Sequence, residues 1–143
     1  MKYLSLILLL CLGCSPVVQP PAVVSYVEST TGTVTVSTEG YGDDLREIKA
    51  SSACNAISRL TFEGIAGSAY SRALVTTSDR KAESFIDGLA EGDWSRYVIS
   101  ISQESEAVRF KGRIKVATYI VSIDVQALRR ALEENGIIRK FGF

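Results

Sequence analysis

The 143-residue sequence contains no histidine, and this absence excludes several kinds of chemistry. Without an imidazole there is no Ser-His-Asp or Cys-His nucleophilic site, no histidine-ligated zinc and no histidine pH switch. Excess charge is also missing, because 16 basic residues balance 16 acidic ones. A neutral chain has no overall field to attract nucleic acid. We therefore expect a non-enzymatic protein with no catalytic residue, no metal site, no cofactor and no nucleic-acid partner.

Proline is scarce as well, and all three prolines lie between positions 16 and 21. The residues before them have the pattern of a secretory signal, with Lys2 followed by an apolar run over 4–12. That run is shorter than the roughly 20 apolar residues that span a bilayer as a helix. It ends in Leu10-Cys11-Leu12-Gly13-Cys14, which resembles the bacterial lipobox, where a small residue precedes the acylated cysteine. Cys11 stands where that family usually has Leu.

The lipobox resemblance implies an exported protein that is cut before Cys14 and held on a membrane by lipid attached to that cysteine. Residues 1–13 would be the signal peptide, 14–24 the lipidated N-terminus with a Pro-rich tether, and 25–143 a single domain. Position 15 is Ser, not the Asp that resembles an inner-membrane retention signal. We therefore expect the periplasmic face of the bacterial outer membrane.

The first half of the domain predicts a strand followed by a long helix. Over 32–38, Val34 and Val36 alternate with Ser and Thr, which is typical of a half-exposed strand. Gly40-Tyr41-Gly42 predicts a turn, and Asp43 is the expected N-cap of a helix that continues to about residue 62. The inward face of this helix is expected to hold residues at helical spacing, namely Leu45, Ile48, Ser52, Ala56 and Leu60.

The second half predicts a helix over 80–90, a strand over 94–102, one long strand over 108–123 and a helix over 125–134. Residues 137–143 are a candidate last strand. The order β-α-α-β-β-α, with this possible final β, predicts an α+β two-layer sandwich: a mostly antiparallel sheet with helices on one face.

The segment from Val34 to Leu60, with Gly40-Tyr41-Gly42 leading into a helix of small residues, resembles the N-terminal motif of LPP20-type lipoproteins and related flagellar assembly proteins. In that family a strand ends in Gly-x-Gly, and a helix with Ala at every fourth position packs on the sheet. Here Ile48 and Ser52 replace two of those alanines. The resemblance implies an envelope-associated accessory of a larger assembly and carries over no catalytic residue.

Four basic residues alternate along the expected long strand, so their side chains should form one row about 20 Å long. They are Arg109, Lys111, Arg113 and Lys115. One interpretation is a solvated face that discourages edge pairing. The other is a docking site for an anionic partner, and the row is the candidate partner-binding site. The intervening Val108, Phe110, Ile114 and Val116 are expected to face the core.

Two further groups have ordinary structural interpretations. Cys54 is expected to be a small packing residue, although a disulfide to a partner remains open in an oxidising compartment. Asp43, Asp44 and Glu47 fit the first turn of a helix better than a metal site.

We therefore expect a lipid-anchored periplasmic envelope protein that serves as a structural or assembly accessory, with an envelope protein as its partner. The alternative is a binder of a small ligand or glycan that uses a groove beside the basic row. An accessory should expose an apolar patch or a sheet edge, whereas a binder should have a concave pocket.

Overall fold

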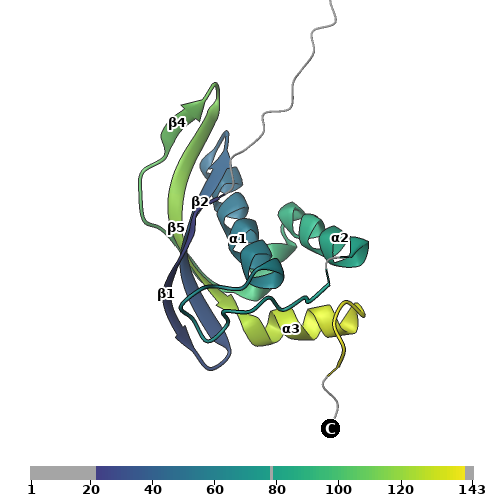
Figure 1. Cartoon of the computed structure of the whole chain (residues 1–143). Coiled ribbons are helices and arrows are strands. Elements are labelled where there is room, and N and C mark those ends of the chain that lie inside the picture. The colour runs from purple at the N-terminus through teal and green to yellow at the C-terminus, as the bar shows by residue number, and fades with distance from the viewer. Residues whose placement is uncertain (1–21, 78, 141–143) are drawn as a thin grey trace, which may run out of the picture.

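The computed structural model of the chain describes residues 22–77 and 79–140, and its five strands form one antiparallel sheet. The strands are β1 (Val24–Thr30), β2 (Thr33–Gly42), β3 (Val98–Gln103), β4 (Val108–Lys111) and β5 (Ile114–Asp124). The helices are α1 (Leu45–Phe62), α2 (Arg80–Gly88) and α3 (Val125–Glu134). The sheet order is β1-β2-β5-β3, with β4 also paired to β5. All three helices lie on one face of the sheet (Figure 1), so the predicted α+β two-layer sandwich is confirmed.

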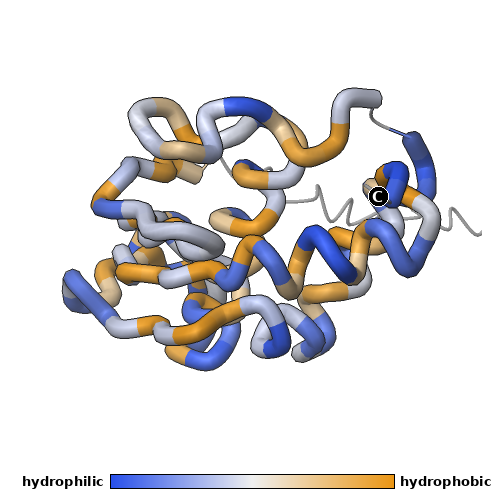
Figure 2. Tube along the Cα trace, turned by 90° about the horizontal axis from the view of Figure 1, so that it is seen from below, coloured by the Kyte–Doolittle hydropathy of each residue, from blue (hydrophilic) through white to orange (hydrophobic). Residues whose placement is uncertain are grey.

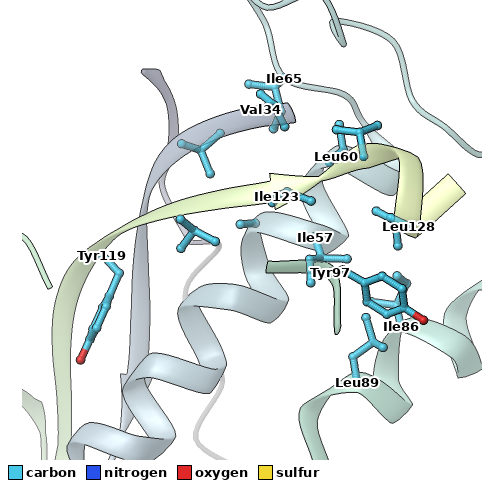
Figure 3. Packing of buried hydrophobic residues seen from close by; sticks show 14 of the residues in the cluster. Val34, Ile57, Leu60, Ile65, Ile86, Leu89, Tyr97, Tyr119, Ile123 and Leu128 are labelled. Carbon is cyan, nitrogen blue, oxygen red and sulfur yellow. The ribbon is translucent and has the colours of Figure 1, made fainter. Parts of the chain in front are cut away.

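The core forms where the central strands β2 and β5 face α1. Val34 pairs with Ile123 and Val36 with Val121, and all four side chains are buried. The close-up in Figure 3 shows the residues that α1, α2 and α3 bring onto this layer. They include Ile57, Leu60, Ile86 and Leu128, and the 3-10 segments that follow α2 add Leu89 and Tyr97. The predicted strand and the inward direction of Val34 and Val36 are therefore confirmed, but Thr35 on the other face is also buried, so the strand is not half-exposed there.

Close contact between α1 and the sheet depends on glycine. A Cβ atom at Gly40 would overlap the Ile48 carbonyl oxygen and the Ser52 hydroxyl oxygen, so only glycine lets the helix backbone lie this near the strand. Ile48, Ser52, Ala56 and Leu60 are fully buried, as their helical spacing predicts. Leu45 is 54% exposed, so its expected inward orientation is wrong.

The chain does not turn at Gly40-Tyr41-Gly42, as the sequence had indicated, but stays extended to the end of β2. Gly40 and Gly42 are required because α1 lies close to the strand, and not because the chain turns there. The N-cap of α1 is Asp44 rather than Asp43: an Asp44 carboxylate oxygen accepts from the Glu47 N–H at 2.9 Å. The Glu47 carboxylate in turn accepts from the Asp43 N–H at 2.8 Å, so the acids do cap the helix.

Four other expectations are corrected. β1, which was not predicted, starts within the expected tether and forms an edge of the sheet. Residues 93–97 form a 3-10 segment, so the strand begins at Val98 rather than at Trp94. The expected strand over 108–123 is a hairpin, with β4 and β5 separated by Gly112 and Arg113. Residues 137–140 are not extended, and 141–143 lie outside the described residues.

The remaining helices follow their capping signals. Asp79 accepts from the Ala82 N–H and Asp124 from the Ala127 N–H, each at 2.9 Å. Gly136, with φ of 68°, follows α3 as the expected left-handed residue. Hydrophobic and hydrophilic residues are interleaved along the chain (Figure 2), and within the described ranges no helix is long and apolar enough to cross a membrane.

Candidate functional site

The β4–β5 hairpin extends the sheet at the end that α2 and α3 leave uncovered (Figure 1). Lys111 pairs with Ile114, so Gly112 and Arg113 form a two-residue loop. Gly112 has φ of 58°, and the loop therefore resembles type II′ turns, which have glycine first and join twisted antiparallel strands without splaying them. The pair Gly112-Arg113 is the sequence signal for this hairpin. It was missed because apolar residues alternate on both sides of it, which predicted one continuous strand.

The hairpin keeps the four predicted basic residues together but does not align them in a row. Arg109 lies directly opposite Lys115, whereas a register shift between Arg109 and Lys111 breaks the alternation. Arg113 lies in the loop. All four side chains are exposed, and none forms an ion pair within the described ranges. The predicted straight row is therefore wrong, and the four charges surround a short hairpin tip.

The two faces of the hairpin differ in chemistry. Gly42 faces α1, Lys115 pairs with Gly42, and Arg109 pairs with Lys115, so both basic side chains lie on the α1 side. Tyr41, Val116 and Val108 are paired across the three strands and lie on the other side. The α1 side of the tip thus carries the Arg109 and Lys115 pair, whereas the opposite side carries the apolar residues and Lys111, which pairs with Ile114.

The apolar face of the tip is open to solvent. Val108 is 58% and Phe110 43% exposed, so the expectation that they face the core is wrong. Phe110 contacts Tyr41 edge-on with ring centroids 5.1 Å apart, and Tyr41 itself is buried. Burial and the neighbouring Glu39 carboxylate raise the pKa of Tyr41. The apolar residues of β5 change faces after Val116: Ala117 pairs with Gly40 on the α1 side, whereas Val116 lies on the side away from α1. β5 pairs with β2 without a register shift through Val116.

The charges on the hairpin do not stabilise the fold. Like charges directly opposite each other on antiparallel strands are destabilising, and Arg109 and Lys115 form such a pair. We call the surface formed by Val108, Arg109, Phe110, Lys111, Arg113 and Lys115 the hairpin tip.

Cys54 lies on α1, half-buried against the core, and is a free thiol. Burial raises its pKa from 9.0 to about 11. A thiol that stays protonated is a poor nucleophile and a slow partner in disulfide exchange. These properties favour the packing role.

A groove of about 780 Å³ lies at the other end of β5, not beside the basic residues as the binder alternative had placed it. It runs between the loop 69–77 and the end of α3.

Lipidation at Cys14 is a prediction for a residue outside the described ranges. Within those ranges, no group of three or more Cys, Asp or Glu residues is arranged to hold a metal ion. No family model, curated protein or solved structure matches the chain. The resemblances to the lipobox and to LPP20-type lipoproteins therefore remain predictions.

Proposed function

We propose that the protein is a lipid-anchored periplasmic accessory of an envelope complex, without enzymatic activity, and that it docks an acidic protein surface through the hairpin tip. The anchor is Cys14, on the periplasmic face of the outer membrane. The observation that carries the proposal is the combination, on one projecting hairpin, of exposed Val108 and Phe110 with four unpaired basic side chains.

Several features of the tip support docking over a purely solvated surface. The Phe110 ring is 43% exposed, and its contact with water is unfavourable. Burial of the ring against a partner would contribute favourable free energy to binding. The like-charge pair Arg109 and Lys115 would be relieved by carboxylates from outside. Both strands of the tip are held at fixed register, so the surface is formed before the partner arrives.

Charge reversal tests the docking. Lys111→Glu with Arg113→Glu should reduce retention of an acidic envelope partner by at least about tenfold, because two of the four positive charges of the tip become negative and repel the partner. The matched control is Arg80→Glu with Lys81→Glu, which makes the same change at two exposed residues of α2. Co-purification from detergent-extracted membranes, with unfolding temperature as a check on folding, measures the effect. Equal retention by both double variants, or retention that does not fall with added salt, would reject the hairpin tip as the docking surface.

A further inference from the structure

The groove at the α3 end of the molecule has a distinct composition. Its floor and walls include partly or fully buried apolar side chains, namely Leu74, Val75, Ile137 and Ile138. Three arginines also line it: Arg72, Arg129 and Arg139. None of the described lining residues is acidic, and none of these arginines forms an ion pair within 22–77 and 79–140.

Both walls of the groove are held by hydrogen bonds. In the loop wall, the Val75 N–H donates to the Thr61 carbonyl at 3.0 Å, and the Tyr70 hydroxyl accepts from the Gly32 N–H at 2.7 Å. In the other wall, the Ile137 N–H donates to the Leu132 carbonyl at 2.9 Å. The groove is therefore present before any ligand binds, and its volume of about 780 Å³ falls within the range of sites for small molecules.

From this composition we infer that the groove binds a single-chain amphiphile with an anionic head, whose carboxylate or phosphate oxygens pair with the arginines while its alkyl chain lies on the apolar floor. Three cations and no acidic residue in the lining favour a negative head group. The apolar side chains would make affinity depend on chain length. The inference does not depend on docking at the hairpin tip, because the two surfaces lie at opposite ends of β5.

The test is calorimetric titration of the purified protein with dodecanoate below its micelle-forming concentration. We expect saturable binding of one molecule, with affinity falling by up to about fourfold for each CH₂ removed. Arg129→Gln should weaken binding by about fivefold, and adding Arg139→Gln should weaken it further. Arg130→Gln is the matched control, because it removes a neighbouring exposed arginine of α3 that does not line the groove. Its affinity should be unchanged.

Dodecyl phosphate and dodecyltrimethylammonium distinguish the kinds of head group. Binding of both anions and not of the cation supports the inference, and whichever anion binds more tightly identifies the head group. Equal binding of the cation, equal loss in the Arg129 and Arg130 variants, or no saturable binding would overturn it. Unfolding temperatures of all variants separate loss of the site from loss of the fold.

Discussion

Two adjacent serines of α1 illustrate how differently the same side chain behaves at a helix–sheet contact. The Ser51 hydroxyl accepts from the Tyr41 N–H at 3.0 Å, which satisfies a backbone donor at the end of β2. The Ser52 hydroxyl is fully buried above Gly40 and has no partner among the described residues. An unpaired buried hydroxyl costs free energy, whereas a paired one contributes a modest amount.

We predict that Ser51→Ala lowers the free energy of unfolding by about 1–2 kcal/mol, because it leaves the Tyr41 N–H unpaired. Ser52→Ala should raise it by about 1 kcal/mol, since it removes an unpaired hydroxyl without opening a large cavity. Both substitutions replace Ser by Ala inside α1, so they raise helix propensity by the same amount. The difference between the two variants therefore reports the hydrogen bonding alone. Urea denaturation measures the difference, and equal changes of the same sign would contradict the assignment of these contacts.

Cys54 provides a second prediction at this scale. With a pKa of about 11, it should react with iodoacetamide at pH 8 roughly 100-fold more slowly in the folded protein than in denaturant. Because its pKa is raised on folding, its contribution to stability is complete below pH 9 and is lost as the pH rises through about 11. Peptide mapping by mass spectrometry locates the modified thiol. Equal rates in the two states would show that the side chain is not desolvated.

At the scale of elements, the hairpin formed by β4 and β5 combines a stable turn with an unfavourable charge pair. Arg109→Glu would place opposite charges across the strands at the Lys115 pair. We predict a gain in the free energy of unfolding of up to about 1 kcal/mol, together with weaker retention of the acidic partner. Chemical denaturation and co-purification, run on the same variant, measure the two effects. If stability and retention change in the same direction, the charges serve the fold and not a partner.

Elements with strong local signals could be predicted from the sequence. Asp124 and Gly136 bracket α3, and alternating Val34 and Val36 mark β2, because capping and period-two burial act over a few residues. The sequence predicts which basic residues form the hairpin tip, but not how they are arranged. Apolar residues at 108–116 continue the alternation of a buried strand, but the pairing of β2, β5 and β4 places Val108 and Val116 on the side away from α1, where no helix covers them. The bulge at Arg109 and Lys111 has no sequence signal that we can identify.

At the scale of the whole molecule, β5 connects two different surfaces. Its first residues belong to the hairpin tip, and its last residue, Asp124, caps α3 beside the arginine-lined groove. Ten residue steps along an extended strand correspond to roughly 33 Å, so a partner at one end leaves the other accessible. β1 begins at Val24, soon after the Pro-rich segment, and a lipid at Cys14 would hold this edge of the sheet nearest the membrane.

The proposed anchor would determine which partners the hairpin tip can meet, and the intact mass of the protein extracted from cell membranes with detergent tests it directly. We predict a chain that begins at Cys14 and exceeds its peptide mass by a diacylglyceryl group and one further acyl chain. A Cys14→Ser protein should lack this added mass and leave the membrane fraction. A soluble cytosolic protein that keeps Met1 and carries an unmodified Cys14 would contradict the proposed location and the envelope role that depends on it.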